Sequence, residues 1–176
     1  MRHLISILLE NETGALSRVV GLFSQRGYNI ETLTVAPTED QRMSRMTISI
    51  QSDDIDMEQI KKQIHKLINV HTVSTLEANS EDTLELELIF IKLKAITNPQ
   101  RETIKRLADI FDARIVDVSS ESYTVCLSGG RNKINRLMKT MEEQAEILET
   151  IRSGVVAVSR GPKALGHKAK AALAAE

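Results

Sequence analysis

The sequence is poor in the residues that build disulfides, metal centres and base-stacking surfaces. Its 176 residues include one cysteine, no tryptophan and only 3% aromatic residues. The single Cys126 cannot form an internal disulfide, and no group of cysteines and histidines has the spacing of a zinc site. The scarcity of aromatic side chains argues against a stacking platform for single-stranded nucleic acid. These absences favour a globular protein of a reducing compartment.

Long apolar runs and a surplus of one charge are also missing. The apolar runs span only a few residues, and the stretch after Met1 is too short for the apolar region of a signal peptide. The 23 basic and 24 acidic residues give a net charge of −1, so no basic surplus exists to hold a polyphosphate backbone. We therefore expect a cytoplasmic protein that binds neither membrane nor nucleic acid.

Strand and helix patterns alternate along the first half of the chain. Period-two alternation predicts strands, and apolar spacing of three and four residues predicts two helices between them. The strands cover residues 3–9, 28–36, 44–51 and 70–78, and the helices carry the apolar stripes 16–23 and 57–68. Gly27 is suited to end the first helix, and Asp53 or Asp54 to cap the second. The order is βαββαβ.

The second half repeats this order. Strands are predicted at residues 83–94, 113–118, 123–127 and 155–158, and the helices carry the stripes 104–111 and 134–148. Asn98 before Pro99 predicts the start of the first of these helices, and Gly129-Gly130 opens the second. We expect an α+β chain of two tandem ferredoxin-like βαββαβ units with antiparallel sheets. The units would be residues 1–79 and 80–161, followed by a flexible Lys/Ala-rich tail at 162–176.

No arrangement typical of an active site is evident in the sequence. The four histidines have no catalytic spacing, and Cys126 lies inside an apolar strand, which is typical of a buried, unreactive thiol. A small enzyme and an RNA-recognition domain, which shares the βαββαβ order, are the alternatives. An RNA-recognition domain stacks bases on strand aromatics. The central strands here offer Tyr123 alone, so both alternatives are disfavoured.

The turn Asn11-Glu12-Thr13-Gly14 is the most informative segment. It joins a predicted strand to the start of a predicted helix, where unpaired N–H groups and the helix dipole favour an anion. Gly14 permits a close approach or a positive φ, and Asn11 can accept from an ammonium or hold the loop. The turn is therefore suited to the carboxylate and ammonium of a free amino acid. A purely structural turn is the alternative, and spacing alone favours it.

Several segments carry a family resemblance. LLENETGALSRV, residues 8–19, resembles the opening of an ACT domain, a βαββαβ module that senses amino acids. GLFSQRGYNIETLTVAPTED (21–40), SRMTI (44–48) and the later RSGVVAVSRG (152–161) look like the regulatory small subunit of acetolactate synthase, also called acetohydroxyacid synthase. The resemblance extends over about residues 1–161.

The resemblance implies a non-catalytic regulatory subunit. Such a subunit would bind the thiamine-diphosphate-dependent catalytic large subunit and raise its activity. It would also confer feedback inhibition by valine in branched-chain amino-acid biosynthesis, which includes isoleucine biosynthesis. Thiamine diphosphate, Mg and FAD are expected in the catalytic subunit, and no cofactor or metal is expected in this chain. The alternative is an ACT-domain regulator that senses another amino acid for a different enzyme.

The resemblance also implies a homodimer through the ACT domain, with valine bound at the dimer interface. The matching positions are Asn11, Gly14, Ala15 and Leu16 of one chain, and Asn29 and Ile30 of the other. An unpaired edge strand invites pairing with its twin, which would bring Asn29 toward the partner's turn. The isopropyl group of valine is then expected against Leu9, Leu16, Ile30 and Val35.

The corresponding turn of the second unit, Ala95 to Pro99, differs from the first. It has no glycine, and Pro99 removes one of the helix-end N–H groups. We infer that the second unit binds no amino acid in the same manner. Contact with the catalytic subunit is its expected role, and dimer packing is the alternative.

Overall fold

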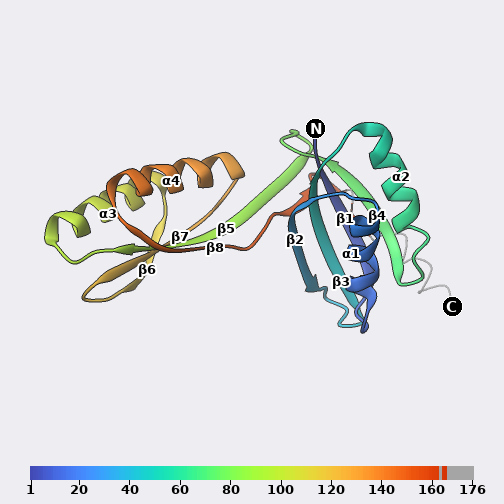
Figure 1. The fold of residues 1–176 in the computed structure, drawn as a ribbon, viewed down its shortest axis with the longest axis horizontal. Helices are drawn as coiled ribbons and strands as arrows, with labels where there is room; N and C mark the ends of the chain where they lie inside the picture. Colours follow the sequence, from blue (N-terminus) through green and yellow to red (C-terminus); the bar gives the residue numbers. More distant parts are fainter. Residues whose placement is uncertain (163, 166–176) are drawn as a thin grey trace. The chain divides into compact units, whose positions relative to one another are not determined.

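The computed structural model of the chain describes residues 1–162, 164 and 165 (Figure 1). The first βαββαβ repeat consists of β1 (Arg2–Glu10), α1 (Ala15–Gln25), β2 (Ile30–Pro37), β3 (Met43–Gln51), α2 (Asp54–Ile64) and β4 (Val70–Glu77). The second repeat consists of β5 (Thr83–Lys94), α3 (Asn98–Phe111), β6 (Arg114–Val118), β7 (Ser122–Gly129), α4 (Arg131–Gln144) and β8 (Ile147–Arg152), and β9 (Val156–Ser159) follows it. The predicted α+β class and the tandem βαββαβ order are confirmed.

The chain forms two compact units. The first consists of residues 1–85 together with the described residues from Val155 onward, and the second consists of residues 86–154. The boundary expected between residues 79 and 80 lies a few residues before this division. Most of the tail predicted to be flexible, at 162–176, falls on residues 163 and 166–176, which lie outside the described residues.

The first unit contains an antiparallel sheet with the strand order β2-β3-β1-β4. Helices α1 and α2 pack on one face of it, where Ile5 and Ile7 of β1 meet Val19 and Phe23 of α1. These four side chains are at most 1% exposed. The two periods seen in the sequence, two for the strand and three to four for the helix, therefore identify the residues of the core. Strand β2 lies at an edge of the sheet.

The opposite face of this sheet receives the C-terminal strand. Val155 and Ala157 pack against Leu4 and Leu76. The Arg45 guanidinium donates to the carbonyl of Ala157 at 3.2 Å, and burial lowers the pKa of this guanidinium. Residues 155–158 were predicted to be the last strand of the second βαββαβ unit. A strand is present there, β9, and it pairs with β5, but the fourth strand of the second repeat is β8, and the residues from Val155 onward belong to the first compact unit. Alternation of apolar residues predicts a strand, but it does not show which residues the buried face of the strand packs against.

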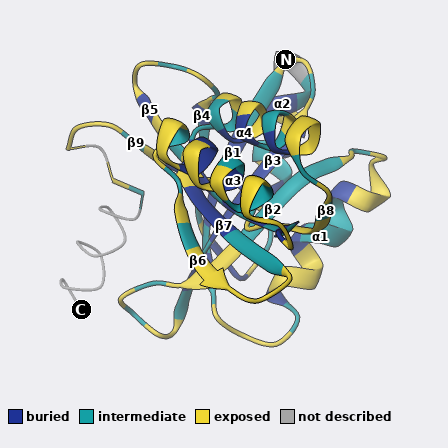
Figure 2. Cartoon of the chain, turned by 90° about the vertical axis from the view of Figure 1, so that its left-hand side faces the viewer, coloured by how far each residue is buried: buried dark blue, intermediate teal, exposed yellow. Residues whose placement is uncertain are grey.

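The second unit contains an antiparallel sheet with the order β6-β7-β5-β8, and α3 and α4 pack on one of its faces. Its fourth strand is β8, within a segment predicted to be partly helical. Helix α4 ends at Gln144, and the next residue, Ala145, is already extended with a φ of −150°. Leu148, which continued the apolar spacing of α4, is 49% exposed on β8. Figure 2 shows that β6, at the edge of this sheet, is largely exposed.

Most helix ends lie at the predicted capping residues. Gly27 follows α1 with a φ of +73°, and the carboxylate of Asp53 accepts from the N–H of Asp56 at 2.9 Å as the cap of α2. Helix α2 ends at Ile64, however, and Ile68 is 86% exposed instead of extending its apolar stripe. Within the described ranges, no helix is long and apolar enough to cross a membrane.

The start of α3 differs from the prediction by one residue. The cap is Thr97 rather than Asn98, because the Thr97 hydroxyl accepts from the N–H of Gln100 while the Gln100 side chain accepts from the N–H of Thr97. This reciprocal capping box outweighs the capping preference of the asparagine. Pro99 lies in the first turn of the helix, where no hydrogen bond requires its missing N–H.

Candidate functional site

The turn between β1 and α1 lies at one end of the first sheet. Its backbone is tied to the β2–β3 turn, because the N–H of Asn11 donates to the carbonyl of Arg42 at 2.7 Å. The side-chain nitrogen Nδ2 of Asn11 donates to the carbonyl of Gln41 at 2.9 Å. Asn11 thus holds the loop, as one of the two sequence interpretations proposed. Its side-chain oxygen Oδ1 is the atom with which it can accept from a ligand.

Gly14 occupies the N-cap position of α1 with a φ of +88° and a ψ of −11°. This left-handed conformation favours glycine. A Cβ built at Gly14 would have no heavy atom within 4 Å, so backbone conformation rather than crowding is the constraint here. The predicted need for glycine in this turn is therefore a need for positive φ.

The first turn of α1 has no side-chain cap and no acidic residue. In the described part of the chain, the N–H of Ala15 donates to the carbonyl of Glu12 at 3.2 Å, and the N–H of Arg18 makes the first helical bond to Gly14 at 3.0 Å. The N–H groups of Leu16 and Ser17, which lie between these two, have no helical acceptor. Together with the helix dipole they make this helix start electropositive and suited to a carboxylate.

The apolar residues around the turn differ in exposure. Ala15 is 2% exposed and Leu9 is 1% exposed, so both side chains belong to the core of the first unit. Leu16 and Val35, in contrast, are 39% and 38% exposed. The expected contact between a ligand and Leu9 is therefore not available at the surface, whereas Leu16 and Val35 are accessible apolar side chains.

Asn29 and Ile30 lie at the other end of the sheet from the β1–α1 turn. In the strand register, Ile30 is opposite Ile50, whereas Pro37, at the far end of β2, is opposite Ser44. Leu9, two residues before the turn, is also opposite Ser44. The seven residue steps from Ile30 to Pro37 correspond to about 23 Å, at about 3.3 Å per residue. Within one chain the six expected site residues therefore form two separate groups.

A polar cluster beside the turn was missed by the sequence analysis. Asn69, 6% exposed, accepts a hydrogen bond from the Arg18 guanidinium. The side-chain Nδ2 of Asn69 donates to the Glu10 carboxylate at 2.6 Å. The backbone carbonyl of Asn69 accepts from the backbone N–H of Glu10 at 2.8 Å. The cluster fixes the first turn of α1 to the end of β1. Its members are up to 59 residues apart in the chain, and no local pattern connects them.

No group of three or more histidine, cysteine, aspartate or glutamate side chains lies close enough to hold a metal ion among residues 1–162, 164 and 165. Cys126 is 5% exposed in β7, which confirms that it is a buried thiol. The candidate site is therefore a polar turn at a helix start and contains no cluster of reactive side chains.

Comparison with family models identifies both halves of the chain. The model of the AHAS small subunit-like ACT domain matches residues 5–72. The model described as the small subunit of acetolactate synthase matches residues 86–161. Each match falls on one of the two βαββαβ repeats, and together they cover most of the chain. The resemblance read from the sequence motifs is confirmed.

Individual relatives agree with the family models. The acetolactate synthase small subunit of Haemophilus influenzae is 51% identical over 163 residues, which cover 93% of this chain and 98% of the relative. The acetolactate synthase isozyme 3 small subunit of Escherichia coli is 49% identical with the same coverage. The crystal structure of the acetolactate synthase small subunit of Thermotoga maritima matches with a TM-score of 0.83 at 34% identity, over 93% of this chain and 99% of that one. The chain therefore belongs to the acetolactate synthase small-subunit family and is a regulatory, non-catalytic subunit.

Proposed function

We propose that this chain binds the catalytic large subunit of acetolactate synthase, raises its activity and makes it sensitive to inhibition by valine. The observation that carries the proposal is the start of α1, where Gly14 leaves the helix without a side-chain cap next to the accessible Leu16. Thiamine diphosphate, Mg and FAD would be bound by the catalytic subunit and not by this chain.

The effector site requires a second copy of the chain. Strand β2 is an edge strand, and antiparallel pairing of two β2 strands about a two-fold axis places the first residue of one strand opposite the last residue of the other. The partner's Ile30 would then lie opposite Pro37, at the end of the sheet where the β1–α1 turn is located. Two groups of residues that are about 23 Å apart within one chain are thereby joined into one site.

Each part of a bound valine has a matching group in this arrangement. The N–H groups of Leu16 and Ser17 would take the carboxylate. Oδ1 of Asn11 and the partner's Asn29 would accept from the ammonium. The isopropyl group would contact Leu16, Val35 and the partner's Ile30, and its burial contributes about 1.5–3 kcal/mol.

Binding at a dimer interface couples to regulation because the ligand favours one relative orientation of the two copies. A coupling free energy of about 1–3 kcal/mol, typical of allosteric proteins, changes activity by about 5- to 150-fold. The second unit would contribute to the contact with the catalytic subunit, since its own helix start is closed by the capping box of Thr97 and Gln100.

The test is a titration of the chain alone and of the reconstituted enzyme. Calorimetry of the dimer should show saturable valine binding, and valine should inhibit the catalytic subunit only when this chain is present. Leucine and isoleucine, titrated in parallel, measure selectivity. A folded dimer that binds no valine at millimolar concentration contradicts the sensing role. A catalytic subunit whose activity is unchanged by the chain contradicts activation.

A further inference from the structure

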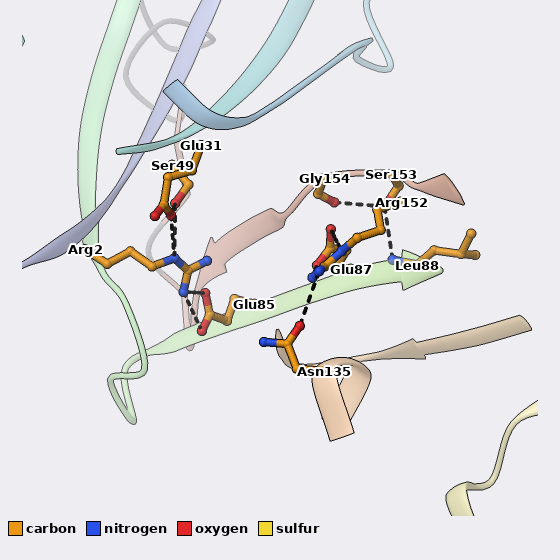
Figure 3. Close-up of polar contacts among 10 residues, drawn as sticks. All are labelled: Arg2, Glu31, Ser49, Glu85, Glu87, Leu88, Asn135, Arg152, Ser153 and Gly154. Atoms are coloured by element: carbon orange, nitrogen blue, oxygen red, sulfur yellow. Dashed lines mark hydrogen bonds and ion pairs between the residues drawn. The ribbon is translucent and has the colours of Figure 1, made fainter. Parts of the chain in front are cut away.

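A largely buried ionic cluster connects the three strands β1, β2 and β3 to a fourth strand, β5 (Figure 3). The Arg2 guanidinium, on β1, donates through Nη1 to both carboxylate oxygens of Glu85 on β5, at 3.1 and 3.4 Å. Its Nε donates to the hydroxyl of Ser49 on β3 at 3.1 Å. The Ser49 hydroxyl in turn donates to the carboxylate of Glu31 on β2 at 3.2 Å. The hydrogen bonds therefore run without interruption from Glu31 to Glu85.

The burial of this cluster is unusual for charged side chains. The side chains of Arg2, Glu31 and Glu85 are 12%, 17% and 12% exposed, and Ser49 is fully buried. The Nη2 atom of Arg2 is buried without a hydrogen-bond partner. Removing charges from water costs several kcal/mol per ion, so a buried ion pair is weak as a stabilising device. We therefore interpret the cluster as a device that holds the strands it connects in one relative position, rather than as a source of stability.

The two ends of the cluster lie at informative positions. Glu31 follows Asn29 and Ile30, the residues that the proposed site takes from the second copy, and the β2–β3 register shifts between Ile30 and Thr32. Glu85 is the last residue of the first unit, and β5 continues from there into the second unit. The start of β2 is thus connected to β5 by a chain of hydrogen bonds that runs through Ser49 and Arg2.

We propose that Arg2 is a positioning residue that couples valine binding at the start of β2 to strand β5 through Ser49, Glu31 and Glu85. The inference rests on the proposed function, since it concerns the transmission of the signal from the same site. Arg2 does not touch the ligand. It holds Glu31 and Glu85 in one arrangement, and a shift of Glu31 on ligand binding shifts the start of β5.

A second buried pair on β5 provides the matched comparison. In the second unit, the Arg152 guanidinium donates to both oxygens of Glu87, at 3.0 and 2.5 Å, and to Oδ1 of Asn135 at 3.2 Å (Figure 3). The side chain of Glu87 is 2% exposed. This pair resembles the Arg2–Glu85 pair in chemistry, although the Arg152 side chain is 32% exposed against 12% for Arg2. It joins β5 to β8 and α4 rather than to β2.

The experiment compares Ser49→Ala, Arg2→Met and Arg2→Lys with the intact chain, each reconstituted with the catalytic subunit. Valine affinity is measured by calorimetry, and inhibition at saturating valine is measured by enzyme activity. Hydrogen exchange reports on residues 83–86. The Ser49→Ala and Arg2→Met chains should bind valine with little change in affinity but should be inhibited at least about fivefold less, the lower limit of allosteric coupling. Valine should slow exchange at 83–86 in the intact chain but not in the Ser49→Ala and Arg2→Met chains.

Controls separate this role from a structural one. Arg2→Lys keeps the charge and should restore part of the inhibition. Arg152→Met removes an arginine–glutamate pair whose carboxylate is buried, and Lys61→Met removes the exposed partner of Glu58, so both should leave the valine response at 83–86 intact. Ser49→Ala removes one hydroxyl and keeps the test valid if Arg2→Met fails to fold.

Three results would overturn the inference. Full inhibition in Ser49→Ala and Arg2→Met would show that the cluster transmits nothing. Loss of valine binding itself in these variants would show that the cluster is part of the binding site. An equal loss of the valine response at 83–86 in Arg152→Met would show that the effect is not specific to the cluster that reaches β2. A lack of any valine response in the intact chain would instead contradict the proposed function, and it is seen before any variant is made.

Discussion

The starts of α1 and α3 occupy the same place in two repeats of one topology, but their chemistry is opposite. Helix α1 begins at Gly14 in a left-handed conformation and has no side-chain cap. At α3, the carbonyl oxygen of the Gln100 side chain accepts from the N–H groups of Ile96 and Thr97, both at 3.1 Å, and Thr97 caps the first turn. One helix start is open to an anion and the other is closed by its own residues. We therefore expect the capacity to bind a ligand to depend on the few residues before the helix and not on the fold.

The edge strands β2 and β6 of the two sheets also differ, in length and in charge. Strand β2 has eight residues, whereas β6 has five and carries Arg114 and Asp117. A short edge strand with charged residues is protected against pairing with another chain, whereas a longer and less charged edge is suited to it. The open helix start and the edge suited to dimerisation thus occur in the same unit, as a site shared by two copies requires.

The largest effect is expected from breaking the dimer edge. Thr34 lies near the centre of β2, so Thr34→Lys would place two like charges close to the two-fold axis. We expect a monomer by sedimentation and no measurable valine binding by calorimetry. Glu77→Lys on β4, at the other side of the sheet, is the control and should remain dimeric. A dimeric Thr34→Lys chain with normal valine affinity would contradict the pairing of β2 with β2.

The second-largest loss of valine affinity is expected from a substitution at Gly14, at the open start of α1. In Gly14→Asp the new carboxylate would occupy the N–H groups of Leu16 and Ser17 and repel the carboxylate of valine. Two charge-assisted hydrogen bonds of about 1.5–3 kcal/mol each would be lost, so affinity should fall by more than about 100-fold. Gly14→Ala is the control, because it introduces only the strain of a positive φ, about 1–2 kcal/mol. If Gly14→Ala abolishes binding as fully as Gly14→Asp, strain rather than charge is decisive.

A smaller effect is expected at the accessible apolar wall of the site. Val35→Ala removes two methyl groups that are 38% exposed in the free chain. At about 0.8 kcal/mol per methylene-sized group, valine affinity should fall by about tenfold, with little change in the melting temperature. The matched variant Val116→Ala, on the exposed edge β6, should leave affinity unchanged. Equal effects of the two variants would exclude Val35 from the pocket.

The smallest effect on valine binding is expected from opening the second helix start. Thr97→Ala removes the cap of α3 and should destabilise the second unit by about 0.5–2 kcal/mol, measured by denaturant unfolding. Valine binding should be unchanged, because the turn before α3 still lacks a glycine and retains Pro99. The appearance of a second class of valine sites would show that the cap alone separates the two turns.

Much of the fold could be predicted from the sequence because its cores follow local periods. Ile5 and Ile7 on β1, and Val19 and Phe23 on α1, were expected on buried faces and are found there. The strand at 155–158 was recognised as a strand and pairs with β5, but the packing of its buried side chains in the first unit was not predicted. Its pattern depends on a partner surface that is far away in the chain, the strands β1 and β4. Local periodicity predicts elements well, and it does not predict which elements pack together.

The candidate site was predictable only in part, for the same reason. The turn from Asn11 to Gly14 is contiguous, so its chemistry could be read directly. The connection of Glu10 and Arg18 to Asn69, and that of Arg2 to Glu85, span 51 to 83 residues and arise only when the sheet forms. The proposed grouping of Asn29 with Gly14 would depend on a second copy of the chain, which one sequence does not describe.

The most direct test of the shared site is a mixed dimer of Gly14→Asp and Asn29→His chains, purified with two different tags. Each variant alone should bind no valine, since every site contains the altered residue. In the mixed dimer, one site combines the intact turn of the Asn29→His chain with the intact Asn29 of the Gly14→Asp chain. The account predicts that calorimetry finds one valine per mixed dimer, with the affinity of the intact protein. A mixed dimer that binds none would contradict a site built from two copies.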